Sequence, residues 1–508
     1  MISRDVKCPL ARAPTLFDVL APHFVHDALY NSRQRQNEHA VTCLPQTRTQ
    51  VLNHIKHWAN STTSTSVFWL YGPAGTGKTT VAHTIAEEYD DGRLAASFFF
   101  WRKTEDRDDI NKLVPTLAHQ IAKRNPSARE QMERILELND SSQMALTSLL
   151  SGSCLEYQLE KLLVRGHVTN LYPPVPNLIV IDGLDECDDQ EGICRLIKWM
   201  CMNRSPYRFL LTSRPEPGIH RSFTSSRGVG QSNVLCLSLT ESKSDIREYF
   251  LKELEELWPK HERIRYGAPS AWPSTSDLDK LVEKSEGLFV YAATAVRHIK
   301  GKGAPDNRLK DILKLHNGLD DLYIQVIKEA MEWERCGIVL GCLMYLRYPL
   351  SINDLSMNLH PGDGRLTIQG AFYALNGCHS ILAIPNFDAP IEPHHASLRD
   401  FLINPSRSKD LFCAPSLSHG RLMYGCLSAI TRAFSDGTHP PVYALVSWHY
   451  HACSFLSAAG NDELAGLNDV IRVLFREIDL NWVINWMTEA LNLAGVPYLR
   501  GELPSKQV

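Results

Sequence analysis

Gly72-Pro73-Ala74-Gly75-Thr76-Gly77-Lys78-Thr79-Thr80 is the stretch that decides the fold of this chain. It follows the apolar run at residues 66–71 and precedes a helical pattern at 81–86, which is the strand–loop–helix context of a G-x-x-x-x-G-K-[ST] phosphate loop. Its glycines permit backbone angles that a Cβ would penalise, so successive N–H groups can turn toward an anion at the positive end of the following helix. With glycine at ~7% of residues, chance would give the bare pattern in roughly 2% of chains this long. We therefore interpret residues 72–80 as a nucleotide-binding loop.

Two side chains of this loop have specific expected roles. Lys78 is predicted to reach the β- and γ-phosphates, and the hydroxyl of Thr79 to hold Mg²⁺. The expected ligands are therefore ATP or ADP together with Mg²⁺.

A second apolar run, four residues at 178–181, leads directly to Asp182. A buried parallel strand delivers such a carboxylate to the edge where open α/β sheets bind ligands. Asp182 is therefore predicted to share the Mg²⁺ with Thr79. Asp185 and Glu186 follow closely and are candidates to orient or deprotonate an attacking water. A solvated acidic loop is the alternative.

A third apolar run, at residues 208–213, is followed by Arg214. We predict that Arg214 points toward the γ-phosphate, and the alternative is a sheet-edge arginine with another partner. Further apolar runs at 95–101 and 234–239 alternate with helical patterns. This alternation predicts an α/β P-loop NTPase fold with a doubly wound parallel sheet, followed by helical, winged-helix and further helical modules.

The domain organisation is predicted from where these patterns change. The expected segments are a weakly structured N-terminal part (1–35), a helix and linker before the loop (36–65), the nucleotide-binding domain (66–240), a helical domain (241–318), a winged-helix-like domain (319–405) and a C-terminal helical domain (406–508).

Three local expectations accompany this division. Thr47 is predicted to cap the helix before the phosphate loop, and this helix either covers the nucleotide base or packs on the sheet edge. Residues 278–299 are predicted to form one long helix. Beyond residue 405 the chain is predicted to be helical to about residue 494, with Trp448, Trp482 and Trp486 as core anchors.

Composition limits the classes of partner. The chain has 508 residues, with 44% hydrophobic and 22% charged, which is typical of a globular protein of several domains. A net charge of −4 gives no electrostatic footprint for nucleic acid or an anionic membrane. The longest apolar runs fall short of the ~20 residues that span a bilayer. We therefore expect no nucleic-acid or membrane partner.

The thirteen cysteines are scattered without a C-x-x-C pair, which indicates reduced thiols in a cytoplasmic protein. Cys187, Cys194 and Cys201 recur every seven residues. This period is typical of one helix face, and we interpret the set as core residues rather than a metal cluster.

The motifs GPAGTGKTT, LIVIDGLDEC, FLLTSRPEP, EGLFVYAATAVRHI and HHASLRDFL occur in that order. Together they resemble a NACHT domain of the STAND class of switch ATPases, of the fungal NOD-like receptor type, over roughly residues 36–500. The resemblance assigns the loop, Asp182, Asp185, Glu186 and Arg214 the roles given above. It further implies that His395 contacts the β-phosphate of bound ADP and holds the winged-helix module closed.

Two features depart from the family. The helix at Gly287 lacks the proline of related domains, which leaves its contact with the base open. Family members usually carry an N-terminal effector domain and C-terminal sensing repeats, whereas about 35 residues precede the resemblance here. A truncated gene product and a stand-alone switch remain as alternatives.

The expected function is an ATP/ADP-binding switch with slow ATP hydrolysis that controls signalling or self-association, as in innate immunity or incompatibility. Self-association is expected in the ATP state, with effector and sensor proteins that the sequence does not identify. The alternatives are a P-loop phosphotransferase, which needs an acceptor site near Asp185, and an AAA+-like remodelling ATPase, which needs an arginine finger and a threading surface.

Overall fold

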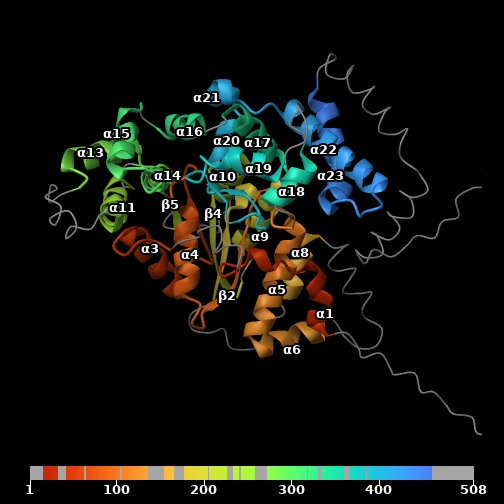
Figure 1. Ribbon diagram of the computed structural model, residues 1–508. Coiled ribbons are helices and arrows are strands. Elements are labelled where there is room, and N and C mark those ends of the chain that lie inside the picture. Colours follow the sequence, from red (N-terminus) through yellow and green to blue (C-terminus); the bar gives the residue numbers. More distant parts are fainter. Residues whose placement is uncertain are drawn as a thin grey trace, which may run out of the picture.

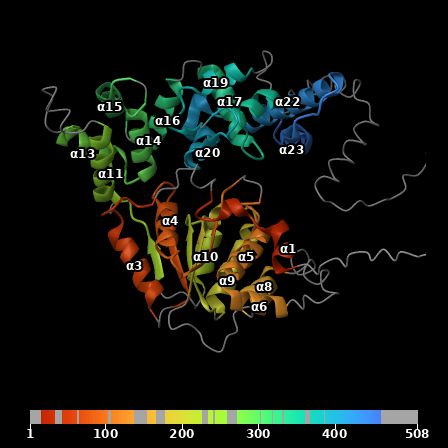
Figure 2. The same cartoon turned by 60° about the horizontal axis from the view of Figure 1, so that its bottom comes forward.

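The computed structural model describes residues 15–32, 42–61, 65–102, 106–135, 154–164, 177–203, 205–225, 233–239, 242–257, 272–301, 303–316, 318–329, 333–359, 367–384 and 386–459. Within these ranges a sheet with helices on both faces forms one part of the molecule, and a layer of helices lies across one end of the sheet (Figure 1, Figure 2).

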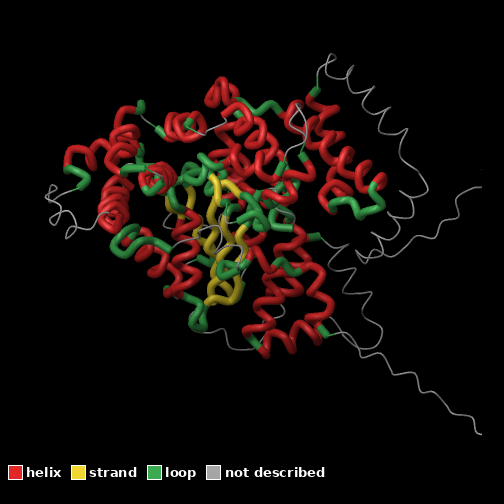
Figure 3. Tube along the Cα trace, viewed as in Figure 1, coloured by secondary structure: helices red, strands yellow, loops and turns green. Residues whose placement is uncertain are grey.

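The main sheet, yellow in Figure 3, is parallel and has the strand order β2-β3-β4-β1-β5. Its strands are β1 (Val67–Tyr71), β2 (Leu94–Phe99), β3 (Asn177–Asp182), β4 (Tyr207–Ser213) and β5 (Val234–Cys236). The predicted parallel sheet is confirmed. The phosphate loop follows β1 and the acidic residues follow β3, so they lie at the same edge of the sheet with one strand, β4, between them.

Alternate residues of each strand enter two separate cores. On β1, Val67 and Trp69 belong to the core on one face, and Phe68 and Leu70 to the core on the other. All four side chains are fully buried, which requires helices on both faces. The sheet is therefore doubly wound, as predicted.

The helices around the sheet supply these two cores. They are α1 (Leu16–Leu20), α3 (Thr49–Asn60), α4 (Lys78–Glu88), α5 (Leu113–Arg124), α6 (Pro126–Ile135), α8 (Leu155–Gln158), α9 (Gln190–Met202) and α10 (Pro217–Thr224). Helices α3 and α4 cover one face, and α1, α5, α9 and α10 cover the other.

The N-terminal segment corrects one prediction. Residues 15–32 are not weakly structured, although they lie in the segment expected to be so. Leu16 is fully buried, and the backbone N–H of Val25 donates to Oγ1 of Thr116 at 3.1 Å. This segment is too short and irregular to show a period of its own, and it is ordered by contacts with a helix about 90 residues away.

The start of α3 corrects a second prediction. The helix begins at Thr49, and the hydroxyl of Thr47 does not cap it but donates to the carbonyl of Leu44 at 2.7 Å. Arg48 occupies the position before the helix with a left-handed backbone (φ 55°). The helix itself packs on the sheet through residues such as Trp58.

The helical layer follows the sheet in the chain. It contains α11 (Ser242–Leu257), α13 (Thr275–Lys284), α14 (Phe289–Ile299), α15 (Pro305–Lys314), α16 (Leu319–Lys328), α17 (Trp333–Tyr345), α18 (Ile352–Asn358), α19 (Ile368–Leu375), α20 (Ser397–Leu402), α21 (Pro405–Ser408), α22 (Pro415–Ser435) and α23 (Val442–Ala458).

One long helix over residues 278–299 was predicted, and the structure has two, α13 and α14. Glu286 and Gly287 lie between them with φ of 50° and 81°. A Cβ on Gly287 would lie 2.0 Å from the carbonyl oxygen of Leu239, so the chain turns closely over the end of the sheet domain. The apolar pattern within residues 278–299 cannot reveal this contact with Leu239, so it does not predict the break between the two helices.

The winged-helix-like part has a short hairpin, β6 (Leu382–Ala383) with β7 (Glu392–Pro393), followed by α20. Ser351 caps α18, because its Oγ accepts from the N–H of Asp354 at 3.0 Å. In the C-terminal part Trp448 is half-buried against the core, whereas Trp482 and Trp486 lie outside the described residues. The predicted domain boundaries stay predictions.

The remaining composition-based expectations concern thiols, metals and membranes. Each cysteine in the described ranges is a free thiol. Cys187 and Cys201 are buried core residues as predicted, whereas Cys194 is half-buried and does not belong to that core. The described residues contain no group of three or more His, Cys, Asp or Glu side chains arranged to hold a metal ion. No helix within the described ranges has the length and apolar character needed to cross a bilayer.

Candidate functional site

The phosphate loop has the backbone that its glycines allow. Gly75 and Gly77 have φ of 79° and 90°, and α4 begins directly after them at Lys78. The carbonyl of Gly75 accepts from the N–H of Val290 at 3.1 Å, at the start of α14. A Cβ on Gly75 would lie 2.3 Å from Cγ1 of Val290. The loop is therefore packed directly against a helix of the helical layer.

Lys78 lies in this loop and is held by backbone carbonyls. Its Nζ donates to the carbonyls of Gly72 and Pro73, at 2.8 Å each. Burial lowers the pKa of Lys78 to about 8, although the charges of Asp185 and Asp182 act in the opposite direction. Among the described residues it forms no ion pair, so the structure places a partly desolvated ammonium where a phosphate is expected.

The acidic strand end lies beside this loop. Asp182 is 3% exposed, and its Oδ1 accepts from Oγ1 of Thr212 at 2.5 Å. The side chain of Thr79 lines the cavity described below. The two residues predicted to share a cation thus lie at the same edge of the sheet, on either side of β4. The charge of Asp182 raises the pKa of Lys78 and so opposes the effect of burial on this lysine.

Asp185 and Glu186 follow in a 3₁₀ turn, η6 (Leu184–Glu186), and differ in their surroundings. Asp185 is 3% exposed, accepts from the N–H of Arg214 at 2.8 Å and lies 3.2 Å from its Nε. Glu186 accepts from the N–H of Arg102 at 3.1 Å. Burial and the charge of Asp185 raise the pKa of Glu186 to about 7. Asp185 is therefore held by an arginine, whereas Glu186 is suited to exchange a proton near neutral pH.

Arg214 connects the sheet to the winged-helix-like part. Its Nη1 lies 2.6 Å from Oδ2 of Asp400 on α20, and its Nε pairs with Asp185. Arg214 lines the cavity and has carboxylate partners there, as the second of the predicted alternatives describes, and its contact with a γ-phosphate stays a prediction.

His395, just before α20, faces the phosphate loop. A Cβ on Gly75 would lie 3.9 Å from Cε1 of this imidazole. Nδ1 accepts from the N–H of Ser397 at 3.0 Å, and Oγ of Ser397 lies 2.7 Å from Nδ1 and 2.9 Å from the hydroxyl of Tyr323. Since Nδ1 accepts, the proton of the neutral ring is on Nε2. Burial and the charges of Arg214 and Lys78 lower the pKa of His395 to about 3, so the ring stays neutral.

One cavity of about 540 Å³ joins these groups, a size typical of small-molecule sites. Its lining includes, of the predicted site residues, Ala74, Gly75, Gly77, Lys78, Thr79, Thr80, Asp185, Glu186, Arg214 and His395. The other predicted residues do not line the cavity but contact or adjoin residues that do. The carbonyls of Gly72 and Pro73 accept from Lys78, and the carbonyl of Thr76 accepts from Arg48. Asp182 lies at the end of β3. The catalytic and binding roles of these residues stay predictions.

Sequence reasoning missed Arg48. This arginine is 6% exposed, and its Nη2 donates to the carbonyl of Thr76 and to Oγ of Ser242 on α11, at 2.7 Å each. Its guanidinium also lies 4.8 Å from the ring centre of Phe289 on α14. Arg48 therefore ties the segment before α3 to the phosphate loop and to the helical layer. The only signal in the sequence was its place within the segment that precedes the loop.

The chain matches a family model over part of its length. The model described as "Nephrocystin 3, N-terminal" matches residues 46–214, which run from just before α3 to the arginine that follows β4. A search of curated proteins gave no match.

Among solved structures, the chain is similar to a signal transduction ATPase with numerous domains (STAND) that carries a tetratricopeptide repeat sensor, from Pyrococcus horikoshii. The identity is 13% and the TM-score 0.41, over 84% of this chain and 49% of that protein, so the chain spans about half its length. A Walker-type ATPase of Pyrococcus abyssi gives 11% identity and a TM-score of 0.34, over 71% of this chain and 97% of that one. Cdc6p of Pyrobaculum aerophilum gives 13% identity and a TM-score of 0.32, over 74% of this chain and 97% of that one. The fold assignment rests on the strand order and the phosphate loop rather than on these distant similarities.

Proposed function

We propose that the chain is an ATP/ADP-dependent switch of the STAND class with slow ATP hydrolysis. The observation that supports it is a single cavity lined by the phosphate loop, by α14 of the helical layer and by His395 of the winged-helix-like part. A nucleotide in this cavity contacts three parts of the chain at once. Its phosphates are therefore placed to control how those parts sit on one another.

The residues fit such a ligand. The ammonium of Lys78, which the described residues leave without an ion pair, suits the β- and γ-phosphates. Thr79 and Asp182 are the residues that would hold Mg²⁺, an oxygen-preferring ion that neutralises charge on phosphate oxygens. The neutral imidazole of His395, with its proton on Nε2, suits a hydrogen bond to the β-phosphate of ADP.

Hydrolysis is expected to be slow because two of the candidate catalytic residues, Asp185 and Arg214, are engaged in ion pairs. Glu186 is our candidate for the base that accepts a proton from water, since its pKa of about 7 lies near the working pH. Asp185 is occupied by Arg214, and Arg214 is further bound to Asp400. An arginine held by two carboxylates must leave one of them before it can reach a γ-phosphate.

The same contacts suggest how the switch operates. With ADP bound, Lys78 and His395 hold the ligand from opposite sides, and Arg214–Asp400 keeps α20 against the sheet. With ATP bound, the γ-phosphate competes with Asp400 for Arg214, and the winged-helix and C-terminal helices are released together. The released form exposes a surface for self-association.

The finer assignment rests on the sequence motifs. We assign the chain to the NACHT branch, of the fungal NOD-like receptor type, as a cytoplasmic component of signalling, because five motifs of that branch occur in order. Its effector and sensor partners are then proteins that recognise the released form.

Nucleotide turnover and retention test the proposal. The full chain is expected to bind ADP tightly, to release it slowly and to turn over ATP well below the ~1 s⁻¹ at which ordinary enzymes begin. Lys78→Ala is expected to abolish binding, and His395→Ala to accelerate ADP release and favour oligomers. His449→Ala, which alters an exposed histidine on α23, is the matched control. Rapid multiple turnover, phosphate transfer to an added acceptor, or ADP release unchanged by His395→Ala would contradict it.

A further inference from the structure

The lysine and arginine side chains that line the cavity fall into two groups, those with and those without a carboxylate partner. Three of its cations have carboxylate partners: Arg48 lies 3.8 Å from Asp245, Arg214 pairs with Asp185 and Asp400, and Lys300 lies 2.7 Å from Glu253. Lys78 and Arg297 have none among the described residues. Lys78 is explained by the expected phosphates, whereas no motif or comparison assigns a role to Arg297.

Arg297 lies near the end of α14 and lines the cavity. Its Nη1 donates to the carbonyl of Ser380, at the start of the β6–β7 region, at 3.1 Å. The other groups that act on its charge are the hydroxyls of Tyr249 and Tyr323, both neutral at pH 7. Burial lowers the pKa of Arg297, because no carboxylate among the described residues offsets its loss of water.

Arg297 lines the same cavity as the phosphate loop and His395. The charges of Arg214, Lys78 and Arg297 all lower the pKa of His395, so positive charge from both the sheet and the helical layer acts on this imidazole. A guanidinium that is partly desolvated and has no counter-charge is unfavourable in the empty protein. It becomes favourable when an anion enters, and arginine has enough donors to bind an anion and the Ser380 carbonyl together.

We propose that Arg297 is a second phosphate-binding residue, which contacts the phosphate chain of the nucleotide from the helical layer while Lys78 contacts it from the sheet. This inference rests on the proposed nucleotide site. One guanidinium then touches both the ligand and the backbone of the winged-helix-like part at Ser380. Binding of the phosphate chain is thereby coupled directly to the position of β6 and β7, independently of Arg214 and His395.

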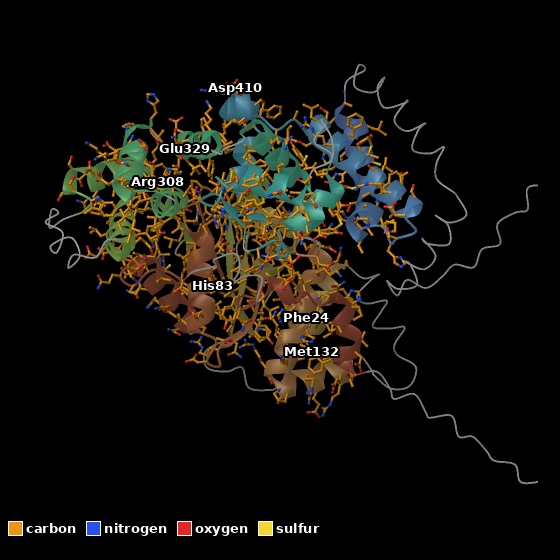
Figure 4. All side chains as sticks on the ribbon, viewed as in Figure 1. Phe24, His83, Met132, Arg308, Glu329 and Asp410 are labelled. Carbon is orange, nitrogen blue, oxygen red and sulfur yellow. The ribbon has the colours of Figure 1, made fainter. Side chains whose placement is uncertain are left out.

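The experiment compares ligands that differ only in their phosphates. Binding of adenosine, AMP, ADP and Mg-ATP to the full chain is measured by calorimetry for wild type, Arg297→Gln and Arg297→Lys. Arg308→Gln is the matched control, because Arg308 is an arginine of the same helical layer that lies near Glu329, away from the cavity lining (Figure 4). Thermal unfolding of each ligand-free variant is measured in parallel.

For Arg297→Gln we expect about a 10- to 100-fold loss of ADP and ATP affinity, the usual effect of removing a charged hydrogen bond, with adenosine unchanged. Arg297→Lys keeps the charge without the planar fork, so it should recover part of the loss. If Arg297→Gln does not fold, the lysine variant still tests the proposal, because it should weaken ADP and leave adenosine unaffected.

Three outcomes would overturn the inference. An equal loss for adenosine and ADP would place Arg297 at the nucleoside instead. Unchanged ADP affinity in both variants, with Lys78→Ala still abolishing binding, would refute the role of Arg297 and leave the nucleotide site intact. Absence of ADP binding to the wild type would remove the nucleotide site and this inference together.

Discussion

The ion pair between Arg214 and Asp400 allows the sharpest prediction about switching. The pair joins the end of β4 to α20 at 2.6 Å, and the two side chains are 21% and 23% exposed. A charge-assisted hydrogen bond in such a partly buried position contributes about 1.5–3 kcal/mol. Asp400→Asn should remove most of this contribution from the closed arrangement alone, because Arg214 keeps its second partner, Asp185.

A loss of that size shifts the closed–open equilibrium by roughly 10- to 150-fold. If opening of this contact limits release of ADP, the rate constant of release should rise by up to that factor. The assay is stopped-flow displacement of a fluorescent ADP analogue from the full chain. The folded sheet domain should retain its unfolding midpoint, since the altered residue lies on α20.

The control removes a similar ion pair elsewhere. Arg407 contacts Asp320 through two hydrogen bonds of 2.9 and 2.6 Å, and both residues belong to the helical layer. Asp320→Asn is therefore expected to leave ADP release unchanged. The reasoning is refuted if Asp400→Asn releases ADP at the wild-type rate, or if both variants accelerate release equally.

Three further perturbations test individual features of the site. Gly75→Ala should abolish binding in a nucleotide titration and lower the free energy of unfolding by about 1–3 kcal/mol, since its Cβ would meet Val290 at a positive φ. The control is Gly92→Ala, which also lies at a positive φ but in open space and should leave nucleotide binding intact. Lys78→Met should abolish ADP binding without lowering the ligand-free unfolding midpoint, because burial already lowers the pKa of this lysine to about 8, and a lowered midpoint would contradict that view. Burial raises the pKa of Glu186 from 4.5 to about 7, so the stability associated with its protonated form is complete below pH 4.5 and lost as the pH rises to 7. In denaturant titrations between pH 4.5 and 7, the free energy of unfolding of Glu186→Gln should not show this loss. Parallel pH profiles of that free energy for the variant and the wild type would refute the raised pKa of Glu186.

The sequence predicted those parts of the site that depend on local patterns. The phosphate loop needs its glycines and lysine at a fixed spacing between a strand and a helix, and the structure has β1 and α4 in those positions. The apolar run that ends at Asp182 is likewise a buried strand, β3. These features were predictable because each is encoded within about ten consecutive residues.

The parts that were not predicted depend on contacts between distant segments. The break between α13 and α14 follows from the approach of Gly287 to Leu239, and the order of residues 15–32 follows from packing on a later helix. Arg48 lies in the segment before the phosphate loop and Arg297 inside a recognised motif, but neither place indicates a role, which appears only when their partners are known. Asp400 was part of a recognised motif, but its pairing with Arg214 required the fold.

Hydrogen exchange of the backbone amides at residues 72–80 and 394–402 tests the central claim most directly, because these segments face one another across the cavity. ADP is expected to slow exchange in both segments. A non-hydrolysable ATP analogue with Mg²⁺ is expected to keep 72–80 slow while exchange at 394–402 becomes faster. Exchange at 394–402 that does not respond to ADP, or that is equally slow with both nucleotides, would contradict the central claim.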